Sequence, residues 1–585
     1  MKEIKNKITK LILNKLFAVR ALQQMPRKAG KASLIALFSC SFISTVLISP
    51  AVSADRIAFS YGALGEFYIS IADLETFATE GKITRSFAYY ADRLSKQDLA
   101  KLRDLLNQSF DINQITVSTF LNLPIGKQLI KELSLIIDSP SRISQPALRG
   151  SLILAASEPE GLTILNVLRL YSTKTLKLNT KRIMAAVDEG TKLLADTERV
   201  FQALEHEAAI VARNRGTIDV NTLTDLKKLG SKKWHQEALV IKTGNRALDS
   251  PFNAGNPRPD KRDNDNGLSR QTEAVVYLPK ATKQPVPLVV IAPGLNTNWQ
   301  NFAYLAEHLA SYGFGVAGVN FPGTNAHRIN AIAKGLDTPP PDNQWVEQPK
   351  VITQLLDEIE RKSQSDRLWQ GKLDLQRVGV IGQSLGGYTA IASAGAKVDW
   401  QHLQRECRQF ENPDRLNLNP ALYWQCQGAK NTPPDTDLQD KRIVAAIAVN
   451  PVTNPIFSQQ GMNKLKSPLM IVTGDADLVA PALDEQLEPF TWLPNTNKYL
   501  VMVKNSTHFS FIGEETEEIK LSSKIDSNLV LARSYLKVLS VAFLKTYLAK
   551  QQEFKPYLTE SYVNSLSKQP LPIDLIRSLD VSQLE

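Results

Sequence analysis

The sequence has few of the residues that bind metals or redox groups. Its 585 residues include three cysteines and six histidines. There is no C-x-x-C pair, and "HEAAI" at 206–210 lacks the second histidine of a zinc-binding H-E-x-x-H motif. We therefore expect neither a metal site nor a cofactor.

Beyond its first 54 residues the chain also lacks a strong excess of one charge. The formal net charge is +10, but residues 1–54 hold nine Lys or Arg and one Glu. The remainder has 60 basic and 58 acidic residues, a net charge of +2. Nucleic-acid binding needs a basic patch in the folded domain, so we expect no nucleic-acid partner.

A long apolar run, "SLIALFSCSFISTVLIS" at 33–49, follows a cluster of basic residues and precedes "PAVSA". The small residues Val52 and Ala54 suit signal-peptide cleavage. We predict a signal peptide over 1–54 and export to the periplasm or the extracellular space. A retained membrane anchor is the alternative, because the run is near the lower length limit for crossing a bilayer. Translation starts at Met1 or Met25.

The cysteines fit an exported protein. Cys40 lies in the apolar run, which leaves Cys407 and Cys426 as an even pair. An oxidising compartment favours a disulfide between them. Two free buried thiols are the alternative.

Residues 55–215 are predicted to form an all-helical N-terminal domain. "SKQDLAKLRDLLNQSF" at 95–110 places four leucines on one face, and apolar residues recur at helical spacing through 180–213. We interpret both stripes as facing a core, with a membrane-binding or lid face as the alternative. This pattern does not reveal the role of the domain.

From about Ser231 the pattern changes to short β-rich runs separated by helix-length segments. "EALVI" and "EAVVYLP" flank a long polar loop and predict an antiparallel pair. "PLVVIAPG", "FGVAGVNF", "RVGVIGQS", "IVAAIAVN", "PLMIVTGD" and "KYLVMVK" then predict a mostly parallel sheet covered on both faces. We expect an α/β domain over 231–550 and a tail over 551–585. Residues 398–441 are interpreted as a cap over the site, with a solvated insertion as the alternative.

One of these strands ends in Gly382-Gln383-Ser384-Leu385-Gly386. This G-x-S-x-G pattern is typical of a nucleophile elbow, in which a strained serine exposes its hydroxyl between a strand and a helix. The two glycines leave room for the neighbouring backbone. Ser384 is therefore the candidate nucleophile.

Functional groups collect at the carboxyl ends of parallel strands. The end of "PLMIVTGD" offers Asp477 as the acid, and His508 follows "KYLVMVK" as the base. The order Ser384, Asp477, His508 is that of α/β-hydrolases. Backbone N–H groups of Leu295, after "PLVVIAPG", and of Leu385 are the expected oxyanion donors.

These motifs, with "VIAPGLNTNWQNFAYLAEHLASYGFGVAGVNFPGTNAHR", "GDADLVAP" and "HFSF", resemble α/β-hydrolases related to platelet-activating-factor acetylhydrolase and dienelactone hydrolase. The whole chain is similar to exported cyanobacterial hydrolases with a helical N-terminal domain of unknown function. Dienelactone hydrolases use a cysteine nucleophile, whereas this chain has Ser384, so the resemblance does not imply lactone hydrolysis. In the animal acetylhydrolases the acid follows the strand after the nucleophile helix, but here that strand ends in Asn450.

We therefore expect an exported serine hydrolase of carboxylic esters, with lipid or phospholipid acyl esters implied by the resemblance. The expected partner is a small-molecule or lipid ester, with association with a membrane surface as a further option; the oligomeric state is open. A serine peptidase and a non-catalytic envelope binding protein on a hydrolase scaffold are the alternatives.

Overall fold

The computed structural model describes residues 53–60, 65–107, 109–110, 114–122, 124–214, 219, 222–243, 270–334, 336–337, 340, 342–410, 419–431, 437–494, 496–513 and 525–584. The chain divides into two compact units, 1–195 with 416–418, and 196–415 with 419–585. The apolar run at 33–49 and most of the predicted polar loop before 270 lie outside the described residues. In the described part, no helix is long and apolar enough to cross a membrane.

The first unit is mainly helical. Its helices are α2 (Ile71–Glu80), α3 (Arg85–Ala91), α4 (Lys96–Asn107), α5 (Gln114–Asn122), α6 (Pro124–Ser134), α7 (Ser141–Ala155), α8 (Ile164–Arg169) and the first part of α9 (Thr180–Asn214). Its strands are β1 (Arg56–Ser60), β2 (Glu66–Ser70), β3 (Ser109–Phe110), β4 (Leu162–Thr163) and β5 (Thr175–Leu178).

The strands correct the expectation of an all-helical N-terminal domain. β1 pairs antiparallel with β2 and parallel with β5, and β3 pairs with β4. Arg56 lies opposite Thr175, and pairing over such a long stretch of chain leaves no periodic signal in the sequence. The leucine stripe of α4 faces the core as expected, because Leu102 and Leu106 are buried.

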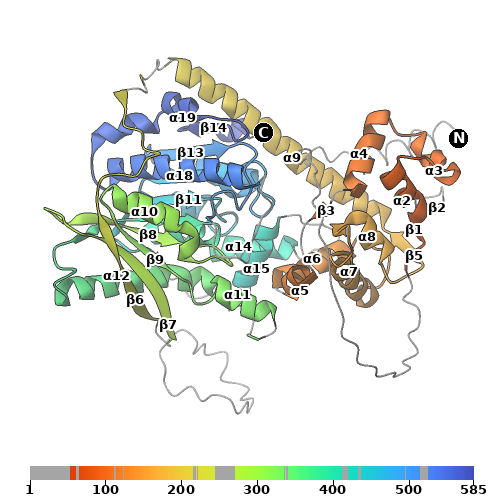
Figure 1. Ribbon diagram of the computed structural model, residues 1–585, viewed down its shortest axis with the longest axis horizontal. Helices are drawn as coiled ribbons and strands as arrows, with labels where there is room; N and C mark the ends of the chain where they lie inside the picture. The colour runs from red at the N-terminus through yellow and green to blue at the C-terminus, as the bar shows by residue number, and fades with distance from the viewer. Residues whose placement is uncertain are drawn as a thin grey trace, which may run out of the picture. The chain divides into compact units, whose positions relative to one another are not determined.

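The second unit contains one nine-stranded sheet (Figure 1). Its strands are β6 (Trp234–Thr243), β7 (Arg270–Pro279), β8 (Val286–Ala292), β9 (Gly315–Val319), β10 (Leu373–Gln383), β11 (Ile443–Val449), β12 (Leu469–Gly474), β13 (Lys498–Val503) and β14 (Ile573–Ile576). They lie in the order β14-β13-β12-β11-β10-β8-β9-β7-β6. The pairs that join β8 to β13 are all parallel, β7 pairs antiparallel with β9, and β6 and β7 form the expected antiparallel pair.

Helices cover both faces of this sheet (Figure 1). The helices described in this unit include η5 (Trp299–Phe302), α10 (Ala303–Ser311), α11 (Ala326–Ala333), α12 (Gln344–Ser365), α13 (Leu385–Ala394), α14 (Trp400–Phe410), α15 (Pro420–Gly428), η6 (Ala429–Asn431), α16 (Gln459–Met462), η7 (Leu483–Leu487), α17 (Glu488–Thr491), α18 (Ile525–Tyr547), η8 (Gln552–Leu558), α19 (Glu560–Leu566) and η9 (Val581–Gln583).

Adjacent residues of a central strand belong to different cores. Val289 packs in the cluster that contains α10 and α18, whereas Val290 packs in the cluster that contains α12 and α13. Successive side chains of a strand point to opposite faces, so a strand buried on both sides becomes a continuous apolar run. This explains why these strands were visible in the sequence.

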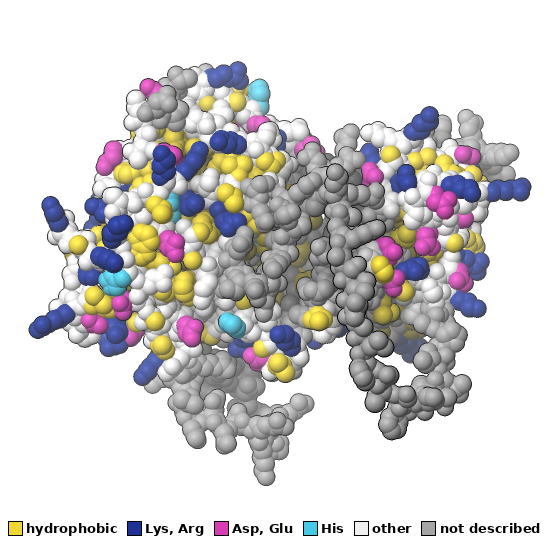
Figure 2. Space-filling view, viewed as in Figure 1, with side chains coloured by type: hydrophobic (Ala, Val, Ile, Leu, Met, Phe, Trp, Pro, Cys, Tyr) yellow, Lys and Arg dark blue, Asp and Glu magenta, His cyan; other side chains and the backbone are white. Residues whose placement is uncertain are grey.

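The segment after 550, which we expected to be a tail, is part of this fold. β14 pairs antiparallel with β13, with Val501 opposite Leu575, and η8 and α19 pack in the cluster that contains α18. Ile573 and Leu575 are buried, and the apolar area they remove from water stabilises the edge position. On the face that Figure 2 shows, acidic and basic side chains of the described residues are interspersed.

Candidate active site

Ser384 stands at a sharp turn between β10 and α13. Its φ of 57° and ψ of −122° are unusual for a residue with a side chain. Such a conformation costs on the order of 1–3 kcal/mol and persists where the surrounding structure enforces it. The Ser384 N–H donates to the Val449 carbonyl at 2.9 Å, which ties the turn to the end of β11. The expected strand-turn-helix is therefore present.

The glycines beside Ser384 are required by close backbone contacts. A Cβ on Gly382 would lie 1.9 Å from the Gly386 carbonyl oxygen, and one on Gly386 would lie 1.9 Å from the Ala292 carbonyl oxygen. A real Cβ does not approach an oxygen so closely, so any side chain at these positions would displace the turn. The turn thus packs directly on the end of β8.

The loop after β8 lies next to Ser384. A Cβ built on Gly294 would be 3.0 Å from the Ser384 Cβ. Leu295 follows as a half-buried residue, and Asn296 has a positive φ of 59° while its N–H donates to the Thr324 carbonyl at 2.9 Å. Leu385 is the buried first residue of α13. The two predicted oxyanion donors therefore flank the turn that carries Ser384.

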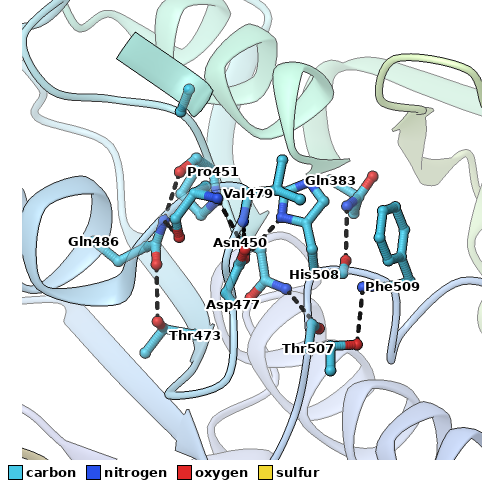
Figure 3. Close-up of polar contacts among 12 residues, drawn as sticks. Gln383, Asn450, Pro451, Thr473, Asp477, Val479, Gln486, Thr507, His508 and Phe509 are labelled. Carbon is cyan, nitrogen blue, oxygen red and sulfur yellow. Dashed lines mark hydrogen bonds and ion pairs between the residues drawn. The ribbon is translucent and has the colours of Figure 1, made fainter. Parts of the chain in front are cut away.

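Asp477 and His508 form a buried pair (Figure 3). His508 Nδ1 lies 2.7 Å from Asp477 Oδ2. Because an ionised carboxylate can only accept, Nδ1 is the donor and Nε2 remains as the basic nitrogen. The other carboxylate oxygen, Asp477 Oδ1, accepts the N–H groups of Val479 and Ala480, both at 2.8 Å. These contacts fix the orientation of the acid and, through it, of the imidazole.

The neighbouring Asp475 has a different partner. Its Oδ1 accepts the Asn505 N–H at 2.6 Å, and burial raises the pKa of its carboxyl group. It therefore bonds the backbone of the loop after β13, while Asp477 contacts the histidine.

Two exposed apolar side chains stand beside the pair. Leu478 directly follows Asp477 and is 66% exposed, and Phe509 directly follows His508 and is 54% exposed. The Phe509 ring is nearly perpendicular to the imidazole, with 5.4 Å between ring centroids. Neither residue was predicted from the sequence. Their adjacency to the acid and base was the only available signal.

The remaining histidines have other environments. His308 is buried, its Nε2 lies 3.0 Å from the Leu226 carbonyl, and burial lowers its pKa to about 4. His327 and His206 are exposed. His235 pairs with Glu237 in β6. None of these contacts involves Asp477 or His508.

Helices α14 and α15 belong to the segment that we interpreted as a cap. A disulfide between Cys407 and Cys426 joins them. Gln425 of α15 binds the loop after β11, because its Nε2 donates to the Asn454 carbonyl at 2.8 Å and its Oε1 accepts the Ile456 N–H at 2.9 Å. The disulfide ties the two helices to each other, and the Gln425 hydrogen bonds attach the segment to the rest of the domain.

Two family comparisons match parts of the chain. Residues 53–179 match a family described as an alpha/beta hydrolase of unknown function (DUF1400), and residues 265–403 match a family described as PET hydrolase-like. The second match includes Ser384 and ends before Asp477 and His508. The comparison with curated proteins finds no match. The matches confirm the expected fold, and the second one points to an ester hydrolase acting on a small-molecule ester.

Proposed function

Because the chain belongs to the α/β-hydrolase superfamily, we propose that it is an exported serine esterase that cleaves carboxylic esters with an apolar acyl group. Lipid and phospholipid acyl esters are the favoured natural substrates. The observation that carries the proposal is the 2.7 Å contact between His508 and Asp477, combined with the strained turn at Ser384.

In this mechanism His508 Nε2 removes the Ser384 hydroxyl proton while Oγ attacks the ester carbonyl carbon. The backbone N–H groups of Leu295 and Leu385 stabilise the negative oxygen of the tetrahedral intermediate. Collapse of the intermediate breaks the bond to the alcohol, which receives the proton from His508 and leaves an acyl-enzyme. Water, deprotonated by His508, then attacks the acyl carbon; the bond to Ser384 Oγ breaks, the acid is released, and His508 returns the proton to Oγ. Asp477 orients the imidazole and stabilises its cation.

The surroundings support an apolar substrate. Leu478 and Phe509 expose apolar surface beside the acid and the base. An acyl chain that covers them would gain roughly 25 cal/mol for each Å² of apolar surface removed from water. The match to PET hydrolase-like proteins supports ester hydrolysis as the reaction.

The strained serine distinguishes this proposal from a binding protein on a hydrolase scaffold. A scaffold without catalysis has no use for a backbone conformation that costs stability, and functional sites are where such conformations persist. Export is supported by the signal-like segment over 1–54 and by the Cys407–Cys426 disulfide, since oxidising compartments favour disulfides.

A panel of p-nitrophenyl esters from acetate to long acyl chains, together with membrane phospholipids, tests the proposal. We expect hydrolysis by the purified chain and loss of that hydrolysis in Ser384→Ala with an unchanged unfolding temperature. Equal activity of Ser384→Ala and the parent protein would rule out the mechanism.

A further inference from the structure

The segment Lys504–His508, here called the histidine loop, connects β13 to the catalytic base. Three side chains at the carboxyl ends of other strands contact its backbone. Gln383 is the last residue of β10, Asn450 directly follows β11, and Asp475 directly follows β12. β10, β11, β12 and β13 are successive parallel neighbours, so their carboxyl ends lie along one edge of the sheet.

Gln383 contacts the histidine itself (Figure 3). Its Nε2 donates to the His508 carbonyl at 3.1 Å, and the side chain is buried. A Cβ on Gly294 would be 2.6 Å from Gln383 Oε1, so the same amide also fills the space beside the loop after β8. Gln383 thus links the histidine loop to the region of the proposed oxyanion donors.

Asn450 contacts the preceding residue of the loop. Its Nδ2 donates to the Thr507 carbonyl at 3.2 Å, and the residue is fully buried. The backbone of Asn450 has a positive φ of 43°, and its N–H donates to the Val472 carbonyl at 2.8 Å. Asparagine adopts this left-handed conformation more easily than most residues, so the position suits an amide on a tight turn.

Asp475 contacts the beginning of the loop through the Asn505 N–H at 2.6 Å. Next to this contact, the Ala476 N–H donates to the Ser506 carbonyl at 3.2 Å. Each residue from Asn505 to His508 therefore has a backbone contact with the end of another strand. Each hydrogen bond is weak alone, but together they hold the loop in one conformation.

We propose that Gln383, Asn450 and Asp475 form a strand-end clamp whose role is to position His508 for catalysis. This inference rests on the proposed function of His508 as the base. The clamp residues are positioning residues, because they bind the backbone of the loop and leave the imidazole free to bond Asp477. A displacement of about 1 Å at a catalytic group can lower the rate about 100-fold, so the loss of one clamp contact should be measurable.

Gln383→Met and Asn450→Gly, alone and combined in the full chain, test the proposal. Methionine keeps the length of glutamine without its N–H donor, and glycine accepts the positive φ of Asn450. The matched control is Gln348→Met, because Gln348 is a buried amide of α12 that bonds the hydroxyls of Thr324 and Thr389.

Three quantities are measured for each variant: kcat and KM for p-nitrophenyl acetate, hydrogen exchange of the peptide 503–511, and the low-field proton resonance of His508 Nδ1–H. We expect a single clamp substitution to lower kcat about tenfold and the double substitution about 100-fold, with KM within about twofold. Exchange in 503–511 becomes faster and the resonance shifts or broadens. Gln348→Met lowers the unfolding temperature but leaves the resonance and this exchange unchanged.

The clamp is refuted if folded single variants keep the parent kcat, or if kcat falls while the exchange and the resonance stay unchanged. The readouts also separate this inference from the proposed function. A parent protein that hydrolyses no ester would contradict the esterase proposal, whereas exchange and the His508 resonance would still report whether the side chains hold the loop.

Discussion

Asp477 Oδ2 lies 2.7 Å from His508 Nδ1, although the two residues follow different strands and are 31 positions apart. β12 and β13 are adjacent and parallel, so the residues after them emerge at the same edge of the sheet. Asp475, two positions earlier, bonds the Asn505 N–H instead. The two aspartates therefore have separable roles.

Asp477→Asn is expected to lower kcat by roughly 10²–10⁴-fold with the fold intact, because an amide at this position favours the wrong histidine tautomer. Asp475→Asn should cost far less, since its side-chain oxygen still accepts the Asn505 N–H. Steady-state kinetics and unfolding temperatures of both variants check this. Near-full activity of Asp477→Asn with loss in Asp475→Asn would reverse the assignment.

Phe509→Ala is expected to reduce kcat/KM for long-chain p-nitrophenyl esters about tenfold more than for the acetate, since losing an apolar side chain that the bound acyl chain covers costs about 1.5 kcal/mol. The control is Leu368→Ala. Leu368 is also partly exposed but precedes β10, and it therefore lies at the opposite edge of the sheet from the site. An equal effect on short and long esters would show that Phe509 does not contact the acyl chain.

Glu485 makes stability depend on pH. Its carboxyl group is buried, and the carboxyl oxygens accept hydrogen bonds from Thr453, Asn454, Asn419 and Gln425. Burial, opposed by these donors, raises its pKa from 4.5 to about 8. Between these values the folded chain keeps a proton that the unfolded chain releases, so the free energy of unfolding falls as pH rises.

Glu485→Gln should remove this part of the pH dependence. We expect the unfolding temperature of the parent to fall more steeply than that of the variant from pH 5 to pH 8, as measured by calorimetry at matched ionic strength. Parallel curves would mean that the Glu485 pKa lies near 4.5 in the folded state.

The exported protein is expected to begin near Asp55 and to contain the Cys407–Cys426 bond. Intact mass of protein from the exported fraction, alkylated with and without prior reduction, measures both. The double substitution of both cysteines by serine should lower the free energy of unfolding by about 3 kcal/mol, since the bond closes a loop of 19 positions. Two alkylated thiols without reduction would be inconsistent with the bond.

Local patterns predicted most of the second unit. β8 and β10 to β13 are buried on both faces and read as continuous apolar runs, which the sequence shows directly. The turn at Ser384 was predictable because close backbone contacts restrict Gly382 and Gly386 to glycine. The apolar runs and the G-x-S-x-G pattern are each contained in a short segment, so they can be recognised before any contact between distant segments is known.

Contacts between distant segments were not predictable. β14 has four residues, too few for a clear alternation, and it is stable because the edge of β13 offers a partner. The contact of Asn450 with Thr507 depends on two loops meeting beyond the sheet, 57 positions apart. In the sequence, Asn450 was noted only because its position lacks a carboxylate. Its hydrogen bond to the Thr507 carbonyl becomes apparent once the two loops are placed.

The central claim is that Ser384 is an activated nucleophile, and site mapping of a fluorophosphonate probe tests it most directly. A fluorophosphonate reacts with a serine hydroxyl only where a base removes its proton efficiently. Mass spectrometry of the labelled, digested parent protein should place the modification on Ser384, with labelling lost in Ser384→Ala and strongly slowed in Asp477→Asn. Modification of another serine, or no modification of the folded protein, would contradict the account.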